Sequence, residues 1–180
     1  YSVAITHAHI AEVYFAEERY DRALDEWRSA LTGYKAEQDT MGIAVSMEAM
    51  ARAFEQAGRK DSAFVYFGYT ADLMRALGSP QHAGMMRYQQ SLLQENASDT
   101  TVLRMQQEAL DLLSNAHDKL GRCIILEGLG RTQTRMGLFA EAERALREAL
   151  TIAAKSGFKK NRAGLHAALS ALFERMHQTD

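Results

Sequence analysis

The sequence predicts an all-α protein in which antiparallel helix pairs stack side by side. Apolar and small residues recur at spacings of three and four along almost the whole chain, and residues at these spacings share one face of an α-helix. The pattern returns after about 40 residues, which is typical of stacked supersecondary units. The chain has a single proline and no stretch of alternating apolar and polar residues, so strands are not expected.

The second helix of each predicted pair carries a small, a large and a small side chain on one face. Successive members are four and three residues apart, so they lie on neighbouring helical turns. Such a face suits close packing against a partner helix. The three trios are Ala23, Trp27 and Ala30, then Ala63, Phe67 and Thr70, and finally Ala142, Leu146 and Ala149.

The first helix of each pair carries a matching apolar face. A small residue follows its middle member directly, at Ala11, Ala51 and Gly130. A small side chain at this place allows two helix backbones to approach closely. The three faces are His7, Ile10 and Tyr14, then Met47, Met50 and Phe54, and finally Leu126, Leu129 and Gln133.

Turn residues repeat with the helices. Gly58 and Gly137 are expected to end first helices in the left-handed conformation. Asp39 and Asp118 are expected to cap the next first helices, and Asp61 is expected to cap a second helix. The predicted helix spans are 2–17, 20–36, 40–57, 60–77, 81–95, 99–116, 119–136, 139–156 and 159–177.

One domain is predicted over residues 1–180. Its units are 2–37, 40–77, 81–116 and 119–156, followed by a closing helix at 159–177. The third unit is degenerate, because Gln106 falls where a large apolar residue belongs. A single repeat cannot bury its own apolar face, so the four pairs are expected to share one elongated core. The chain begins at Tyr1 rather than methionine, which indicates an excerpt of a longer protein.

These positions resemble the tetratricopeptide-repeat (TPR) family, whose signature contains Leu-Gly, a tyrosine, and a later alanine and phenylalanine. The fourth unit matches at Leu126, Leu129, Gly130, Gly137, Ala142, Leu146 and Ala149, and the first at Ile10, Tyr14, Ala23, Trp27 and Ala30. The resemblance implies a right-handed α-α superhelix. The period near 40 residues, against the usual 34 or so, resembles the long-repeat subgroup, which includes kinesin light chains and the sensor regions of bacterial regulators.

The resemblance also implies that first helices line a concave groove where the family binds peptides. Rotation about each helix axis selects the side chains that face this groove. The family's clamp for chaperone tails uses asparagines and lysines, and none occurs at these positions. The predicted groove residues are Glu12, Phe15, Glu48, Arg52, Glu55, Met86, Gln90, Glu127, Arg131 and Arg135.

Two units place a glutamate and an arginine four residues apart, at Glu48 and Arg52 and at Glu127 and Arg131. One interpretation is an ordinary helix-stabilising pair worth about 0.2–0.5 kcal/mol. The other is a guanidinium held by its neighbour, ready to receive a peptide carboxylate or a backbone carbonyl. Both interpretations stay open at the level of the sequence.

Composition argues against several function classes. The net charge is −2 and the pI about 6.3, whereas nucleic-acid binding usually needs a basic face. No apolar run reaches the ~18 residues that span a bilayer. His7 and His9 lie on different helix faces and form no metal site, and the single cysteine, Cys123, is expected to be a buried structural thiol. No acid, base and nucleophile converge, so no enzyme, cofactor or metal is predicted.

The sequence therefore favours a cytoplasmic scaffold that binds a peptide or helical segment of another protein in its groove. The alternative is a sensor or regulatory module of a bacterial regulator that responds to a small ligand or peptide. Self-association through the ends of the solenoid is a further possible interaction. No direct contact with nucleic acid or membrane is expected.

Overall fold

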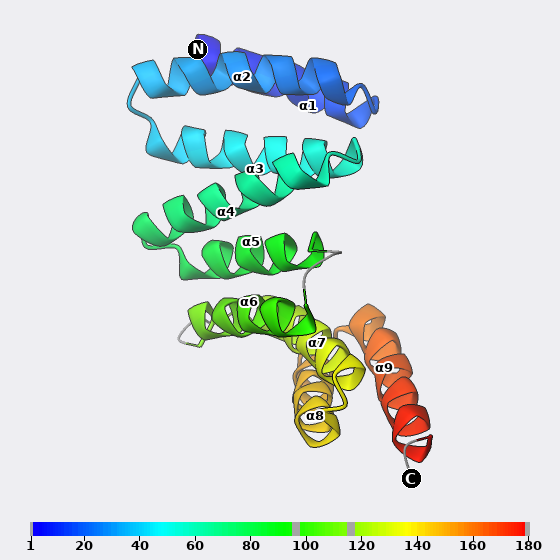
Figure 1. Cartoon of the computed structure of the whole chain (residues 1–180). Coiled ribbons are helices and arrows are strands. Elements are labelled where there is room, and N and C mark those ends of the chain that lie inside the picture. The colour runs from blue at the N-terminus through cyan, green and yellow to red at the C-terminus, as the bar shows by residue number, and fades with distance from the viewer. Residues whose placement is uncertain (1, 95–97, 115–117, 179–180) are drawn as a thin grey trace. The chain divides into compact units, whose positions relative to one another are not determined.

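A computed structural model describes residues 2–94, 98–114 and 118–178, and these residues form nine α-helices (Figure 1). No strand occurs among them. None of the helices in these ranges combines the length and the apolarity needed to cross a bilayer. The helices are α1 (Val3–Ala16), α2 (Tyr20–Ala36), α3 (Thr40–Gln56), α4 (Lys60–Ala76), α5 (Pro80–Leu92), α6 (Asp99–Leu112), α7 (Lys119–Arg135), α8 (Phe139–Ser156) and α9 (Lys159–His177).

The predicted all-α class is confirmed, and each predicted helix exists within a few residues of its expected bounds. The largest differences are at two helix ends. The helix α5 ends at Leu92 rather than 95, and α6 ends at Leu112 rather than 116. Residues 95 and 115–116, where these predictions also fall, lie outside the described residues.

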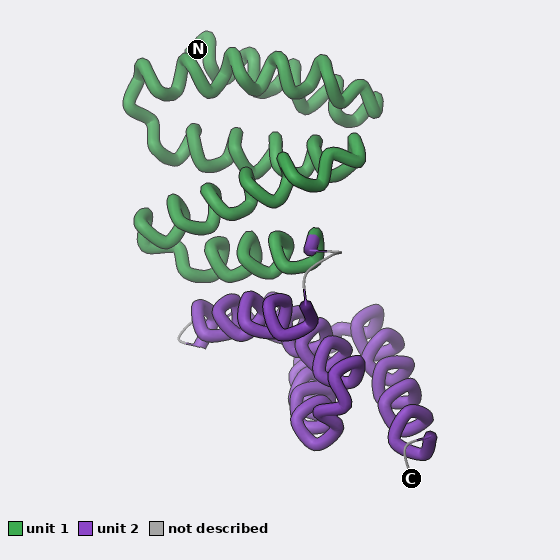
Figure 2. The backbone as a smooth tube through the Cα atoms, in the orientation of Figure 1, with its two compact units in different colours: residues 1–93 green, residues 94–180 purple. Residues whose placement is uncertain are grey.

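The chain divides into two compact units, residues 1–93 and 94–180 (Figure 2). In the first unit, α1 packs on α2, α2 on α3, α3 on α4, and α4 on α5. In the second, α6 packs on α7, α7 on α8, and α9 on both α7 and α8. Each unit has a core cluster of its own. One continuous stack over residues 1–180 stays a prediction.

The repeated trios form the centres of these cores. In α4, Ala63, Phe67 and Thr70 are each 0% exposed. The corresponding residues of α2 and α8 are also buried, as the sequence predicts. The degenerate position, Gln106 of α6, is buried too, and its side-chain oxygen has no hydrogen-bond partner among the described residues. A polar side chain thus occupies a core position in the third unit.

Close helix approach explains Gly130, which follows the apolar residue Leu129 on α7. A Cβ atom at position 130 would lie 2.6 Å from Cγ of Leu146 and 3.3 Å from the carbonyl oxygen of Ala142, both on α8. Real Cβ atoms do not come this close to other heavy atoms, so only glycine fits without a shift. The prediction that a small residue brings two helix backbones together is confirmed here.

The turns follow two recurring designs. Asp39 accepts a hydrogen bond from the backbone N–H of Gly42 at 2.9 Å, and Asp118 accepts one from Gly121 at 2.8 Å. Both aspartates therefore cap first helices as predicted. The prediction for Asp61 was wrong: Arg59 is the N-cap of α4, and Asp61 lies in the first turn, where its charge favours the positive end of the helix.

Residues in the left-handed backbone conformation follow six of the described helices. Gly58 and Gly137 have φ of 73° and 76°, as expected for a cap in this conformation. Gly78 and Gly157 have the same conformation after second helices. In the first helix pair the equivalent places are taken by Glu18 and Gln38, with φ of 58° and 57°.

Candidate functional site

A cavity of about 270 Å³ lies between α1 and α3 in the first unit. The two helices provide most of its lining, and Trp27 of α2 also contributes. It combines apolar and charged side chains, as binding sites for peptides and small molecules usually do. Its lining residues are Glu12, Phe15, Trp27, Val45, Glu48, Ala49 and Arg52.

The apolar part of the cavity, here called its floor, is formed largely by the aromatic rings of Phe15 and Trp27. Trp27 is only 4% exposed and belongs to the core cluster of the first unit. The ring of Phe15 packs against Trp27 with a centroid distance of 5.7 Å, and against Tyr20 at 5.6 Å. Tilted ring contacts at these distances are favourable. Val45 is 53% exposed at the edge of the cavity, so apolar surface there faces solvent.

The rim of the cavity is charged. Arg52 donates to Oε1 of Glu48 at 2.5 Å. The glutamate side chain is 19% exposed and the arginine side chain 58% exposed, so the pair leaves most of the guanidinium accessible. Glu12 and Glu55 form no ion pair with any other residue that the structure describes. The rim therefore presents one held guanidinium beside the unpaired carboxylate of Glu12, and Glu55 lies nearby on α3.

The structure brings four of the ten predicted groove residues together. Glu12 and Phe15 of α1 and Glu48 and Arg52 of α3 line this cavity. Glu55 lies one turn beyond Arg52 on α3 and is half-buried outside the lining. These four residues therefore share one cavity in the first unit, and its use as a binding groove stays a prediction.

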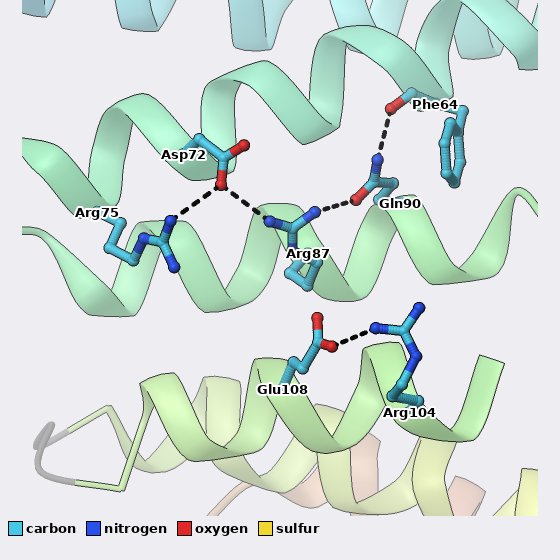
Figure 3. Close-up of polar contacts among 7 residues, drawn as sticks. All are labelled: Phe64, Asp72, Arg75, Arg87, Gln90, Arg104 and Glu108. Carbon is cyan, nitrogen blue, oxygen red and sulfur yellow. Dashed lines mark hydrogen bonds and ion pairs between the residues drawn. The ribbon is translucent and has the colours of Figure 1, made fainter. Parts of the chain in front are cut away.

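The placement of Met86 and Gln90 on an open groove was wrong. Met86 is 3% exposed and belongs to the core of the first unit. Gln90 is 5% exposed, and its Nε2 donates to the carbonyl oxygen of Phe64 on α4 at 3.0 Å (Figure 3). Gly68 makes this contact possible, since a Cβ there would lie 2.5 Å from Nε2. Both residues hold α5 against α4.

A polar network continues from Gln90 along the same two helices. Arg87 of α5 donates to the Gln90 oxygen at 2.7 Å and to Asp72 of α4 at 3.0 Å (Figure 3). Asp72 also accepts from Arg75 at 3.5 Å. Arg87 is the least exposed arginine of this group, at 22%. The network is explained by the packing of α4 on α5 and adds nothing to the cavity.

The second Glu–Arg pair is closed by a neighbouring helix. Arg131 of α7 donates to Glu127 at 2.8 Å and, through Nη2, to the carbonyl oxygen of Gly164 on α9 at 3.1 Å. A Cβ at position 164 would lie 2.9 Å from Oε1 of Glu127, so the glycine permits the approach. Glu127 thus holds the guanidinium of Arg131, which donates to a main-chain carbonyl of the same chain.

Arg135 is also engaged inside the second unit. Its guanidinium donates to Oδ1 of Asp99 on α6 at 2.7 Å. Its own carbonyl oxygen accepts a hydrogen bond from Arg175 of α9 at 3.1 Å. The predicted groove residues of α7 therefore make contacts with α6 and α9.

The structure brings no catalytic set together at the cavity. Among residues 2–94, 98–114 and 118–178, no group of three or more His, Cys, Asp and Glu side chains could hold a metal ion. Cys123 is buried, and burial together with the charge of Glu127 raises the pKa of its thiol. A thiol held protonated is a poor nucleophile. Its Sγ donates to the carbonyl oxygen of Ala149 at 3.5 Å.

Three cavity residues, Trp27, Val45 and Ala49, were missing from the predicted site. Trp27 was assigned to the core because its spacing matches a packing trio, and the same ring also forms the cavity floor. Ala49 adjoins Glu48 and is too small to give a signal of its own. The tryptophan could have been found from the pairing of helices, since the second helix of a pair packs against the first and brings Trp27 next to Phe15.

The chain is similar in structure to several solved proteins, while no family model and no curated protein matches it in sequence. Aspartyl phosphate phosphatase F from Bacillus subtilis superposes with a TM-score of 0.81 at 14% identity, over 98% of this chain and 50% of that one. BtubC (BKLC) from P. vanneervenii gives 0.74 at 19%, over 86% and 65%.

A putative kinesin light chain with nearly identical TPR-like repeats, from Podosopora anserina, gives a TM-score of 0.76 at 13% identity. The match covers 98% of this chain and 88% of that one. Against the phosphatase, the chain spans about half the length of the solved protein. Likeness at these identities concerns the fold.

Proposed function

We propose that this chain, whose fold is that of the TPR-like helical repeats, is a protein-interaction module. Its first unit would hold a peptide or helical segment of another protein in the groove between α1 and α3. The observation that carries the proposal is the cavity there, with an aromatic floor and a charged rim on first helices. Fold alone does not define a partner, so the chemistry of this groove carries the argument.

The cavity suits a side chain and its flanking main chain better than a large ligand. Its volume of about 270 Å³ lies near the lower end for small-molecule pockets. Aromatic surfaces and arginines are enriched where proteins bind one another. Phe15 and Trp27 can take up an apolar anchor, while Arg52 can donate to a main-chain carbonyl or a carboxylate.

The interval of about 40 residues supports membership of the long-repeat subgroup. α2, α3 and α4 are each 17 residues long. Ala23 and Ala63 occupy matching buried positions forty residues apart. Long helices give a longer groove on each pair, which suits a partner segment that contacts several turns.

One alternative makes use of the same cavity. The chain would then be a cytoplasmic regulatory module of a larger bacterial protein that senses a small ligand or a short peptide. The closeness of apolar and charged side chains in the cavity supports this alternative, because a small ligand could contact both. The two proposals differ in what fills the cavity, which a binding experiment can decide.

The test is selection of peptides from a random library on the full chain, followed by affinity measurement. Trp27, the single tryptophan, forms the cavity floor, so its fluorescence reports occupancy directly. We expect Arg52→Ala and Phe15→Ala each to weaken binding by roughly 1 kcal/mol or more, as for desolvated anchors.

The matched control is Arg104→Ala. Arg104 is an exposed arginine of α6 that pairs with Glu108 at the same i,i+4 spacing (Figure 3). We expect this variant to bind like the original chain. Peptides that bind both groove variants with unchanged affinity would contradict the proposal. A tryptophan response to small molecules, with no peptide selected, would favour the sensor alternative.

A further inference from the structure

We infer that the groove between α1 and α3 selects a basic segment that carries a glycine next to an apolar anchor. This inference rests on the proposed function, because it names the chemistry of the peptide that the groove would hold. It starts from a contact that the chain makes with itself. The contact is the capture of α9 by the Glu–Arg pair of α7.

The contact between α7 and α9 shows what a held arginine does on a first helix. Glu127 fixes the guanidinium of Arg131, and the remaining Nη2 donor meets the carbonyl oxygen of Gly164 at 3.1 Å. A charged donor to a main-chain carbonyl is stronger than a neutral one. The bond depends on the main chain of α9 coming close to α7.

Glycine permits that approach. A Cβ at position 164 would lie 2.9 Å from Oε1 of Glu127, so the carboxylate would have to move from its place beside Arg131. The pair and the glycine therefore belong together. A glycine at the point of contact lets a main chain reach such a pair without displacing the glutamate, because it has no Cβ.

The pair on α3 has the same chemistry and faces the cavity. Glu48 and Glu127 have the same side-chain exposure of 19%, and Arg52 is somewhat more exposed than Arg131, at 58% against 47%. Both Glu48 and Arg52 line the cavity. Within the described residues, Glu48 is the one partner of Arg52. Its other donors are available to a carbonyl brought into the groove.

Charge defines the second requirement. Glu12 lines the cavity and Glu55 lies one turn beyond Arg52, and neither pairs with a described basic residue. Arg52 offsets Glu48 alone, so the rim has an excess of negative charge. A lysine or arginine that flanks the glycine on the side of Glu12, away from Arg52, would meet this excess.

The aromatic floor defines the third requirement. Phe15 and Trp27 leave apolar surface at the bottom of the cavity, and Val45 extends it to the edge. An apolar side chain beside the glycine would cover this surface while the main chain meets Arg52. Anchors of this kind, surrounded by a polar rim, provide most of the energy in peptide recognition.

The chain itself contains a segment with all three features, and it can serve as the probe. Residues 159–177 carry four lysines and arginines against one glutamate. They also contain Gly164 with Leu165 directly after it. As a separate labelled peptide this segment can be added to the intact chain, in which α9 packs on α7.

The experiment is a titration of the full chain with this peptide, read by Trp27 fluorescence and by anisotropy of the label. We expect saturable binding with a change in tryptophan emission. Replacing Gly164 by leucine in the peptide should weaken binding at least tenfold. Arg52→Ala in the full chain should weaken it at least fivefold, and Glu12→Gln should weaken it and reduce its dependence on salt.

The matched control is Arg131→Ala, which removes the same side chain from α7. If the peptide displaced α9 from α7, this variant would lose the binding and Arg52→Ala would keep it. That result overturns the inference. Circular dichroism of each variant verifies that the helices are intact, and a folded Arg52→Ala variant with unchanged affinity also overturns it.

Failure of this inference and failure of the proposed function look different. Library peptides that bind through Arg52 and contain neither glycine nor basic residues would leave the proposed function in place and overturn the glycine requirement. Equal affinities of the peptides with glycine and with leucine at position 164 would also overturn the glycine requirement and leave the proposed function in place. If no peptide bound in a way that depends on Arg52, both the inference and the proposed function would be overturned.

Discussion

Tyr34 makes the stability of the first unit sensitive to alkaline pH. Its side chain is 8% exposed and packs beside the turn that leads into α3. Burial raises the pKa of Tyr34, and the nearby carboxylates of Asp39, Glu37 and Glu12 raise it further. The folded state therefore keeps the phenol protonated at a pH where the unfolded chain has ionised it.

The sign of the effect follows from proton binding. Between about pH 10, the pKa of an unfolded tyrosine, and the higher folded value, the folded state binds more protons, so the free energy of unfolding falls as pH rises. We expect Tyr34→Phe to remove this loss. Urea unfolding of the original chain and of Tyr34→Phe at pH 8 and pH 10.5 gives the difference in their free energies of unfolding at each pH. A difference that stays constant over this range would show that burial does not control the ionisation.

Rotation about the helix axes selected neighbouring surface residues where one helix face is open. Glu12, Phe15, Glu48 and Arg52 follow from rotation about α1 and α3, and the structure places them around one cavity. The same rotation failed for α5, because residues on more than one of its faces are buried. A rotation rule assumes one solvent face and cannot detect a helix covered on several sides.

The two Glu–Arg pairs show a second limit of residue-level prediction. Their spacing is identical, yet one faces a cavity and the other contacts α9. The difference depends on Gly164, which lies 33 residues after Arg131. Nothing in the sequence around either pair contains this information.

At the scale of the helix, Asp118 is expected to contribute to stability through its cap. Its carboxylate accepts from the first-turn N–H of Gly121, which otherwise lacks an intrahelical partner. Asp118→Ala should lower the free energy of unfolding by about 1 kcal/mol, and Asp118→Asn by only a few tenths, because asparagine can also cap. Thermal unfolding of the two variants provides the measurement. Equal losses would indicate that charge, rather than capping, accounts for the effect.

Helix positions were predictable because several local signals agree. Asp39 and Asp118 mark helix starts, and Gly58 and Gly137 mark helix ends, each for a stereochemical reason. The signal failed at Asp61, where the preceding residues already begin the helix. It also failed at the end of α6, where no glycine follows and the expected stop was four residues late.

At the scale of the whole chain, the two compact units are expected to respond separately to core mutations. Phe67 is fully buried in the core of the first unit, whereas Leu146 is fully buried in that of the second. Replacing a buried phenylalanine by alanine costs about 3–5 kcal/mol. In repeat proteins such losses act mainly on neighbouring repeats.

Two natural probes can follow the units individually. Trp27 reports on the first unit by fluorescence, and the buried thiol of Cys123 reports on the second by its reaction with a thiol reagent. In urea, Phe67→Ala should lower the midpoint seen by Trp27 more than the one seen by Cys123, and Leu146→Ala should do the reverse. If both probes shifted equally in both variants, the chain would unfold as one cooperative unit.

The class of the molecule was easier to predict than its subdivision. Periodicity over the entire chain gives the helical-repeat fold, and the likeness to solved repeat proteins confirms it. The division near residue 93 is less visible in sequence. Its one sign is the degenerate third unit, where Gln106 replaces the large apolar residue that would pack the pair.

The central claim is that a partner segment occupies the cavity between α1 and α3. A photoreactive amino acid placed at Val45, which lines the cavity and is 53% exposed, tests this most directly. With a peptide selected on the full chain, we predict efficient crosslinking at Val45 and little from Tyr69, a 61% exposed residue of α4 outside the cavity. Crosslinking from Tyr69 and none from Val45 would contradict the account.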